Sequence, residues 1–208
     1  MKRTQIAVAL LAASALLLAA CATPSGSAPS GPPAGDRLGA VAPSPPDGEV
    51  IGQGTVLDAG GDAELCMGAV AESYPPQCSG IPLENWSWDG VEGSEQSGDV
   101  RWGAYAVQGM YNGTSFQVTQ PPILLALYDP MVPDDPYGGE PGNADEATLT
   151  GIQDDLPGRL GAAYLSSWPE DGRLRVQVIW DDGAWQRAAD EEFGEGVVVV
   201  ESALRPVG

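Results

Sequence analysis

The sequence predicts an α+β protein, with a small OB-like β-barrel in its N-terminal half and a ferredoxin-like βαββαβ unit in its C-terminal half. Over residues 49–122, short runs rich in Val, Ile, Trp and Tyr alternate with Gly-rich turns, which is typical of a small barrel. From residue 123 onward, strand-like runs alternate with segments of helical spacing in the order β-α-β-β-α-β, which indicates the ferredoxin-like unit. Cys66 and Cys78 bracket a Tyr-Pro-Pro turn within the first half.

Residues 1–20 have the pattern of a secretory signal peptide. Lys2 and Arg3 precede an apolar run over residues 6–20, which is shorter than the roughly 20 residues of a membrane-spanning helix. The run ends in Leu18-Ala19-Ala20-Cys21, which resembles the lipobox of bacterial lipoproteins. That resemblance implies cleavage before Cys21 and a lipid anchor on its thiol, at the extracytoplasmic face of the cell membrane. The alternative is an ordinary signal peptide followed by a chance cysteine.

Residues 21–48 are dominated by Ser, Pro, Gly and Ala. Such a composition buries too little apolar surface to offset chain entropy, so we expect a disordered tether behind the lipidated Cys21. The folded part is expected to divide into a β-rich barrel with a disulfide over residues 49–122 and a βαββαβ unit over residues 123–208.

The chain is strongly acidic, with a net charge of −20, and it contains no histidine. This charge argues against nucleic acid and anionic lipid headgroups as partners, because both require basic patches. It permits cationic partners or calcium, although solubility alone would also explain it. The absence of histidine excludes Ser-His-Asp and Cys-His catalysis and histidine-based zinc sites. Carboxylate chemistry remains, and no cofactor is indicated.

Cys66 and Cys78 are predicted to form a disulfide. An extracytoplasmic compartment is oxidising, and paired thiols there usually form disulfides. The eleven residues between the two cysteines fit neither a CxxC redox motif nor a zinc ribbon. With Cys21 committed to lipid, the remaining cysteines form an even pair.

Within the first half, Asn112-Gly113 is the strongest turn signal, because a type I′ turn requires positive φ at both central positions. A two-residue turn there would place Val107 opposite Val118 and Phe116 opposite Gly109. An aromatic ring over a cross-strand glycine covers otherwise bare backbone. The other strands are expected at Glu49–Asp58, Ala63–Val70 and Ile81–Trp88, with a loop over Asp89–Asp99.

The second half begins with a fully apolar run, Ile123–Tyr128, that is expected to be a central strand. Asn143 is expected to cap a first helix that ends or kinks at Pro157-Gly158, and Asp182 is expected to cap a second that ends at Gly194. The remaining strands are expected at Ala162–Trp168, Arg173–Trp180 and Val197–Leu204.

Several stretches together resemble a group of uncharacterised actinobacterial secreted lipoproteins. The stretches are LCMGAVAESYPPQCSG, WSWDGVEG, RWGAYAVQGMYNGTSFQVTQPP and SALRPVG, covering most of residues 52–122 and the last fifteen or so. The resemblance supports lipid attachment at Cys21 and pairing of Cys66 with Cys78. It implies no catalytic activity.

The candidate ligand surface comprises Tyr74, Trp86 and Trp88. Trp86 and Trp88 are two residues apart, hence on one face of a strand, where they would stack on sugar rings if exposed and fill the barrel core if buried. An acid-rich loop could instead gather calcium, although no DxDxDG spacing is present and a solvated linker is the simpler interpretation. Its acids are Asp129, Asp134, Asp135, Glu140, Asp145 and Glu146.

The sequence leaves two candidate functions. The first is a lipid-tethered interaction or ligand-binding module of the cell envelope, with an unknown protein or glycan ligand and no catalytic or metal-binding residues. The second is a small carboxylate-dependent hydrolase of glycans or esters, which requires two acids at a fixed separation. No spacing in the sequence singles out such a pair, so the binding module is the favoured interpretation.

Overall fold

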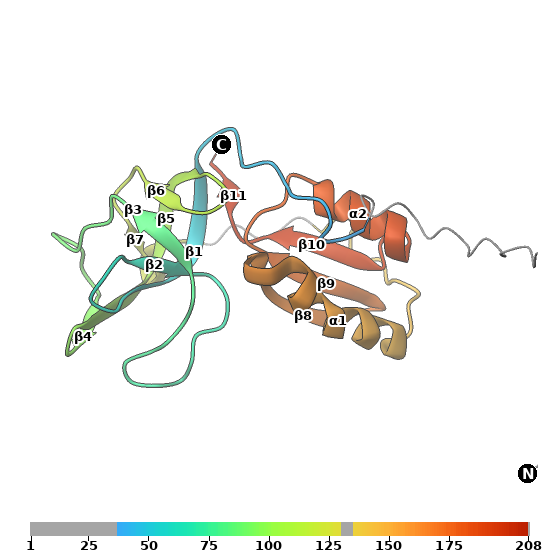
Figure 1. Cartoon of the computed structure of the whole chain (residues 1–208), viewed down its shortest axis with the longest axis horizontal. Helices are drawn as coiled ribbons and strands as arrows, with labels where there is room; N and C mark the ends of the chain where they lie inside the picture. Colours follow the sequence, from blue (N-terminus) through green and yellow to red (C-terminus); the bar gives the residue numbers. More distant parts are fainter. Residues whose placement is uncertain (1–36, 130–134, 208) are drawn as a thin grey trace, which may run out of the picture. The chain divides into compact units, whose positions relative to one another are not determined.

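Two β-sheets organise the computed structural model, which describes residues 37–129 and 135–207 (Figure 1). The first half of the chain builds a closed five-stranded barrel, and the second half builds a three-stranded sheet with two α-helices. The prediction of a mixed α+β protein with a small barrel is therefore confirmed. The predicted signal peptide and Cys21 lie outside the described residues. Among the described ones, neither α-helix has the length and apolar content needed to cross a bilayer.

The barrel closes because β1 pairs with strands on both of its edges. In order around the barrel, β1 pairs with β2, β2 with β3, β3 with β6, β6 with β5, and β5 again with β1. All of these pairings are antiparallel except that of β3 with β6. The strands are β1 (Val50–Asp58), β2 (Glu64–Cys66), β3 (Ile81–Glu84), β5 (Val100–Tyr111) and β6 (Phe116–Val118). Alternate residues of these strands, including Val56, Leu65 and Tyr105, fill the interior.

Three short strands extend this sheet beyond the barrel. The first, β4 (Glu95–Ser97), forms a hairpin with the start of β5 through Gly98, inside the segment expected to be a loop. The second, β7 (Ile123–Leu124), pairs with β5, and the third, β11 (Arg205–Pro206), pairs with the start of β1. The end of the chain is thereby hydrogen-bonded to the first strand of the barrel.

The predicted register of the hairpin is wrong by two residues. The structure pairs Gly109 with Val118 and Tyr111 with Phe116, so the connection is a four-residue loop. The Asn112 side-chain oxygen accepts hydrogen bonds from the backbone N–H groups of Thr114 and Ser115, which stabilises the longer loop. The Phe116 ring still covers Gly109, although the two residues are not directly opposite each other. A Cβ added at Gly109 would lie 2.7 Å from this ring.

The second sheet has the order β10-β9-β8, with β9 antiparallel to β8 and parallel to β10. Alternate residues of β9, Leu174, Val176 and Val178, are fully buried and share one core with α1 and α2. Figure 1 shows the two helices beside this sheet. The elements are α1 (Glu146–Leu160), the 3₁₀ turn η3 (Gly161–Ala163), β8 (Tyr164–Glu170), β9 (Arg173–Val178), α2 (Ala184–Phe193) and β10 (Val198–Ser202).

Both helices begin slightly away from the predicted caps. The N-cap of α1 is Asp145, whose carboxylate accepts from the Thr148 N–H, rather than Asn143. Pro157, the predicted end or kink of the first helix, lies inside α1, which continues to Leu160. The first turn of α2 is held by Asp181, which accepts from the N–H groups of Trp185 and Gln186. The predicted Asp182 accepts from a single N–H of this turn, that of Ala184, and its other oxygen accepts from the Ser44 N–H. The predicted end of α2 at Gly194 is confirmed.

The four-stranded βαββαβ arrangement is not confirmed, because its expected first strand lies elsewhere. Ile123 and Leu124 pair with Ala106 and Tyr105 of β5, and the chain then turns into a 3₁₀ helix, η2 (Leu125–Leu127). Leu127 is 80% exposed, which is incompatible with a central strand. A short apolar run does not by itself distinguish a buried strand from an exposed ledge.

Helix side chains cover the edges of the second sheet. Gln186 of α2 donates to the Val198 carbonyl and accepts from the Val200 N–H, so its amide occupies the position of a neighbouring strand on β10. On the other edge, Gln153 of α1 donates to the Ser167 carbonyl of β8. These contacts satisfy backbone groups that would otherwise offer a template for strand addition.

The predicted tether is shorter than expected, because residues 37–48 pack against α2 and its surroundings. Leu38 is 1% exposed and belongs to the core of the second sheet. The indole N–H groups of Trp185 and Trp180 donate to the carbonyls of Val41 and Ser44. We call residues 37–48 the N-terminal strap. The boundary of the folded part therefore lies before Leu38 rather than at Gly48.

The barrel and the second sheet also share core residues. Ile179 and Leu204, which follow β9 and β10, are buried in the same apolar cluster as the barrel interior, and Leu165 packs against it. The described residues, 37–129 and 135–207, belong to one compact unit. Contacts between the two halves are therefore part of the folded structure.

Candidate functional site

The most elaborate aromatic cluster of the barrel lies on the loop that follows β3. Asn85 ends β3 with a φ of 61°, a left-handed conformation that asparagine tolerates better than most residues. This turn aims Trp86 at the barrel interior, and the rings of Trp86 and Trp88 meet edge to face at 5.1 Å. Both rings also contact Tyr105 of β5, at 5.8 and 6.2 Å. Both tryptophans are half-buried and pack against the barrel core, between the exposed and buried alternatives considered for them.

Contacts with the barrel fix this loop, residues 85–94, in place. The Trp88 indole N–H donates to Asp58 at the end of β1, 3.1 Å away. Tyr105 is 1% exposed and donates its hydroxyl to the Glu92 carbonyl at 2.9 Å, and burial raises the pKa of that hydroxyl. Arg101 donates to Ser94 and stacks over the Trp88 ring at 4.6 Å. The loop is therefore preorganised from both ends.

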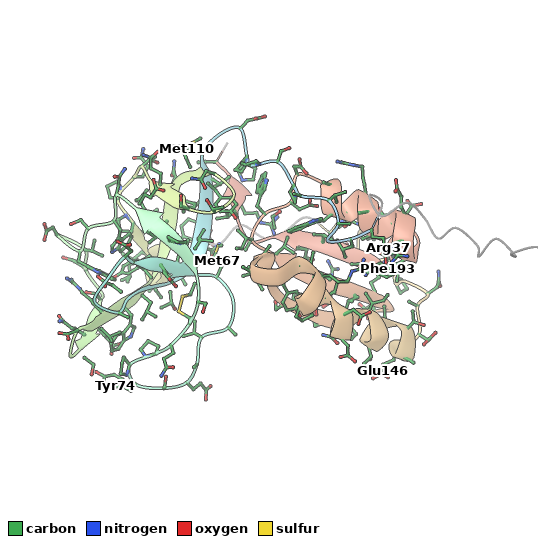
Figure 2. The ribbon with its side chains drawn as sticks, viewed as in Figure 1. Arg37, Met67, Tyr74, Met110, Glu146 and Phe193 are labelled. Atoms are coloured by element: carbon green, nitrogen blue, oxygen red, sulfur yellow. A yellow bond between two sulfur atoms is a disulfide. The ribbon has the colours of Figure 1, made fainter. Side chains whose placement is uncertain are left out.

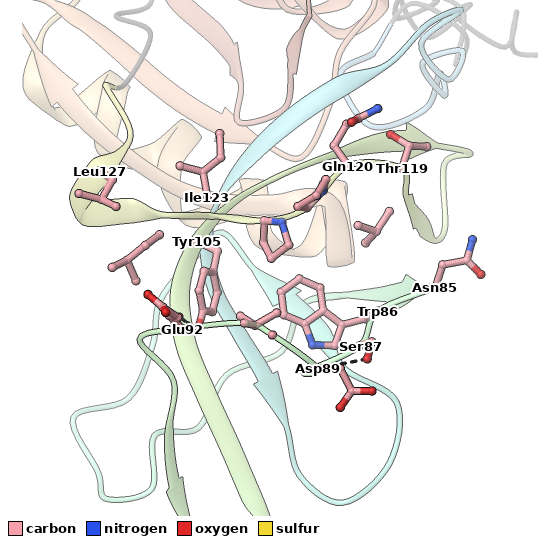
Figure 3. A pocket seen from close by; sticks show the side chains of 16 residues that line it. Asn85, Trp86, Ser87, Asp89, Glu92, Tyr105, Thr119, Gln120, Ile123 and Leu127 are labelled. Carbon is pink, nitrogen blue, oxygen red and sulfur yellow. Dashed lines mark hydrogen bonds between the residues drawn. The ribbon is translucent and has the colours of Figure 1, made fainter.

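Beside this cluster is an open groove with a volume of about 650 Å³, a size common among small-molecule sites. Figure 3 shows Trp86 and Tyr105 between two walls. One wall is the loop that carries Asp89 and Glu92, and the other is the segment from Val118 to Leu127. We call this site the Trp86 groove.

No family model matches the sequence, and neither the curated proteins nor the solved structures include a significant match to it. Function is therefore inferred from the geometry and chemistry of the described residues.

A second hollow, of about 640 Å³, lies on the far side of the same loop and shares Trp86 and Asn85 with the Trp86 groove. Its lining includes the carboxylates of Asp58, Asp62 and Glu84. Trp86 thus lines both the groove and this second hollow, and both are lined by carboxylates. The Trp86 indole nitrogen is buried and has no hydrogen-bond partner among the described residues.

Tyr74 lies apart from Trp86 and Trp88, contrary to the prediction of one shared surface. It is 72% exposed on the loop closed by the Cys66–Cys78 disulfide, and its ring meets Trp102 edge to face at 5.4 Å. Figure 2 labels Tyr74 on this loop and shows the disulfide as a yellow bond. Trp102 and Cys66 belong to a small cluster separate from the barrel interior. The structure brings together the two tryptophans but gives Tyr74 a different aromatic partner.

The predicted disulfide is confirmed: Cys66 and Cys78 are bonded, with Cα atoms 6.2 Å apart. It joins the end of β2 to the segment that leads into β3. The bridge therefore holds the intervening loop, with Tyr74 at its outer part, against the barrel.

The charge of the Trp86 groove is acidic in the described structure. Its lining contains Asp89 and Glu92 and no basic side chain. Exposed amide and hydroxyl groups of Asn85, Ser87 and Gln120 complete its polar rim. The groove is therefore unsuited to phosphates and other anions but offers hydrogen-bond acceptors and donors around an aromatic ring.

Two acids in the second half of the chain are engaged in structural contacts. Burial raises the pKa of Asp181, and this residue lines a hollow with Glu201. However, both Asp181 oxygens accept from backbone N–H groups of α2, and Glu201 is paired with Arg175 at 2.7 Å. These two acids are held by the fold rather than free to attack or protonate a substrate.

The acid-rich segment considered for calcium lies partly outside the described residues, at Asp134. Within the described part, Asp135 accepts from the N–H groups of Tyr137 and Gly139, and Asp145 caps α1. No group of three or more His, Cys, Asp or Glu side chains in the described residues is placed to hold a metal ion.

Several residues that line the Trp86 groove are not predicted as site residues from the sequence. The sequence pattern places Tyr105 in a strand without a site role, and it places Ile123, which is 42% exposed at the groove, in a buried strand. The pair Pro121-Pro122 just before Ile123 is the available signal, since two successive prolines disfavour a central strand.

Proposed function

We propose that the protein is a lipid-anchored lipoprotein on the extracytoplasmic face of the cell membrane, and that its barrel binds a ligand of the cell envelope. The lipobox resemblance at Leu18-Ala19-Ala20-Cys21 and the basic start support the anchor. The Cys66–Cys78 disulfide agrees with an oxidising compartment. The resemblance to actinobacterial secreted lipoproteins points the same way.

The observation that carries the binding proposal is the Trp86 groove. A half-buried aromatic ring is held on a preorganised loop beside an open hollow of about 650 Å³. Preorganisation matters because ordering a loop at the moment of binding would reduce the affinity. If the loop had only a structural role, its tryptophan would not need to border an open groove.

The chemistry of the groove favours a glycan. Saccharide rings have one apolar face that stacks on an indole, while their hydroxyls require amides and carboxylates at the rim. Trp86 provides such a ring, and Asn85, Asp89 and Gln120 provide the polar partners. An uncharged hydroxylated ligand is also compatible with a chain whose net charge is −20.

We also propose that the barrel is OB-like. Its strands follow the order β1-β2-β3-β6-β5 and return to β1, with β3 and β6 parallel. OB-folds are five-stranded Greek-key barrels that bind oligosaccharides and oligonucleotides on their surface. The acidic groove makes the oligosaccharide the better match of these two ligand classes.

The test of the groove is a titration of the purified protein with soluble cell-wall oligosaccharides, followed by tryptophan fluorescence and calorimetry. Trp86→Ala should weaken binding by about tenfold or more, because a stacked aromatic contributes about 1–3 kcal/mol in comparable sites. Trp168→Ala is the matched control, since Trp168 is 37% exposed on β8, away from the groove.

Two results would contradict the proposed ligand site. One is binding of equal strength by wild type and a folded Trp86→Ala variant. The other is turnover of a glycan or ester that a single Asp or Glu substitution abolishes, which would favour the hydrolase instead. Circular dichroism on each variant separates loss of the site from loss of the fold.

The anchor is tested separately by fractionation. Cys21→Ala should release the protein from the membrane fraction or leave the precursor uncut. A variant that fractionates and migrates like the wild type would show that Cys21 carries no lipid.

A protein ligand is the second candidate for the groove. Leu127 and Ile123 form an exposed apolar ledge on one wall, 80% and 42% exposed. A protein partner would bury this ledge, so Leu127→Asp would weaken capture of that partner and leave oligosaccharide binding nearly unchanged. Trp86→Ala affects both, so the pair of variants distinguishes the two ligands.

A further inference from the structure

A separate cavity of about 640 Å³ lies between the disulfide-closed loop and the start of the second sheet. It shares no lining residue with the Trp86 groove. Four segments form its walls: Met67–Ala69, Ser79–Pro82, the turn after β5, and residues 162–165. We call it the staple cavity, because the Cys66–Cys78 bridge lies directly before two of these segments.

The lining of the staple cavity is free of charge. None of the sixteen described residues around it is Asp, Glu, Lys or Arg, although the chain has 29 acidic residues among 208. The Trp86 groove and the acidic hollow beside it, by comparison, are each lined by at least two carboxylates. An ionised group in the staple cavity would lose water contacts without gaining a partner of opposite charge.

The floor of the cavity is apolar and belongs to the barrel core. Leu65, Ile81 and Ile179 are at most 7% exposed and belong to the barrel core. The two tyrosines of the wall have committed hydroxyls: Tyr111 donates to the Gly113 carbonyl at 2.9 Å, and Tyr164 shares a hydrogen bond with Ser167 at 2.7 Å. These two hydroxyls are therefore held by the protein, and the floor itself presents only aliphatic side chains to a ligand.

Small residues keep the cavity open. Gly68, Ala69, Ala162 and Ala163 line opposing walls, where larger side chains would fill the space. Ala69 and Ala162 are exposed. The volume lies within the range of about 300–1,000 Å³ typical of small-molecule sites.

We propose that the staple cavity binds the alkyl chain of an uncharged amphiphile. The apolar floor favours such a chain, because each methylene gains free energy when it leaves water, and the uncharged lining in an acidic chain selects against anionic headgroups. Exposed Thr114 and Ser79 offer hydroxyls to a neutral headgroup at the edge. A stable protein interface would need about 800 Å² from each partner, which a pocket of this size does not provide.

The disulfide has a direct role in this site. Cys66 precedes Met67, and Cys78 precedes Ser79, so the bridge holds the two wall segments of the loop at a fixed spacing. Loss of the bridge would let these segments separate from the floor. Binding in the staple cavity is therefore expected to depend on the oxidised state, while the Trp86 groove lies on a different loop.

The experiment uses the uncharged fluorophore N-phenyl-1-naphthylamine as the probe with the purified, oxidised protein. The expected result is a saturable fluorescence increase, displaced by decanol at least about tenfold more effectively than by decanoate at neutral pH, because only decanoate carries a charge into the uncharged site. Absence of saturable binding, or equal displacement by the two competitors, would overturn the proposal.

Variants locate the probe. Ala162→Trp and Ala69→Trp should each lower its affinity by about tenfold or more, since an indole occupies volume that the alkyl chain needs. Ala147→Trp is the matched control, on an exposed position of α1. Equal probe binding by all three folded variants, or a dimer in sedimentation that Ala162→Trp dissociates, would overturn the assignment. Neither result bears on the glycan titration of the Trp86 groove.

Discussion

In the barrel, each strand is hydrogen-bonded to a neighbouring strand on both sides. In the second sheet, the backbone groups at the two outer edges are hydrogen-bonded to helix side chains instead. The β1 strand pairs with β5 along its whole length and with β2 and β11 on its other edge. The β10 strand, by contrast, receives the amide of Gln186, and β8 receives that of Gln153. The barrel therefore has its strand edges paired by the order of its strands, whereas the edges of the second sheet depend on individual side chains.

The two halves also differ in what they leave open. The barrel carries the Trp86 groove with an acidic rim, where aromatic rings face a hollow. On the second sheet, Arg175 pairs with Glu170 and Glu201 and lies 3.6 Å from Asp135, so one guanidinium holds three carboxylates in an ion-pair network. The open groove with exposed polar groups at its rim lies on the barrel, which is why the barrel loop is the proposed glycan site.

The largest expected loss of stability tests the strand pairing that closes the barrel. Phe116 is fully buried on β6, the three-residue strand that joins β3 to β5. Phe116→Ala should lower the free energy of unfolding by about 3–5 kcal/mol, through lost transfer energy and the cavity left behind. Urea denaturation followed by tryptophan fluorescence measures it. A loss below about 1 kcal/mol would mean that this seam contributes little to the barrel.

The disulfide distinguishes the two halves, because both of its cysteines belong to the barrel half. Replacing both Cys66 and Cys78 by Ala should cost roughly 3 kcal/mol, from the greater freedom of the unfolded chain. The helical circular dichroism of α1 and α2 should be retained below the unfolding transition. Reduction of the wild type should give the same midpoint as the double variant, and unchanged midpoints in both would contradict a structural role.

The edge strand of the second sheet gives the next effect. Gln186→Leu removes the partners of the Val198 carbonyl and the Val200 N–H, at a cost of about 1–3 kcal/mol. Gln117→Leu, at an exposed position on β6, is the control. Hydrogen exchange at the Val200 amide should accelerate in the first variant alone. Equal stability of the two variants would show that water satisfies the Val198 carbonyl and the Val200 N–H as well as the Gln186 amide does.

These contrasts explain which parts of the fold could be predicted from the sequence. Strong local signals predict their elements correctly: Val50–Asp58 forms β1, the alternation in Arg173–Val178 forms β9 with one buried face, and Gly194 ends α2. Element boundaries and register depend on longer-range contacts. The Asn112 side chain bonds to the backbone of the following residues and makes a four-residue loop, which the Asn-Gly pair alone does not indicate.

The candidate site shows the same limit. Trp86 and Trp88 lie together as predicted, but on the loop after β3, which ends at Glu84, rather than on one face of a strand. Tyr74 is close to them in sequence, but the fold gives it Trp102 as a partner. Tyr105 and Ile123 come to the groove through the pairing of β5 with β7, a contact that no local pattern encodes.

The pH dependence of stability is a finer test on the barrel side. Glu49 accepts hydrogen bonds from Thr119 and Gln108, both at 2.6 Å, and these bonds hold its pKa below the usual value. Its contribution is therefore present above the unfolded pKa and lost as the pH falls through the folded pKa. Relative to Glu49→Gln, the wild type should lose stability on acidification, as measured by urea midpoints across the acidic range.

Asp181 in the second half should show the opposite sign. Burial raises its pKa, although the N–H groups of Trp185 and Gln186 oppose the shift. Its contribution is therefore full below the unfolded pKa of about 3.9 and is lost as the pH rises through the folded pKa. Asp181→Asn cannot titrate, and its oxygen can still accept from one N–H. The stability of the wild type relative to this variant should fall as the pH rises from about 4 towards neutrality, because the unfolded chain then ionises more readily. Urea midpoints for both variants over the same pH series give the two slopes. Slopes of equal sign would show that the Asp181 carboxyl is not held in a desolvated position, and that the charged groups of the two halves respond to acid in the same way.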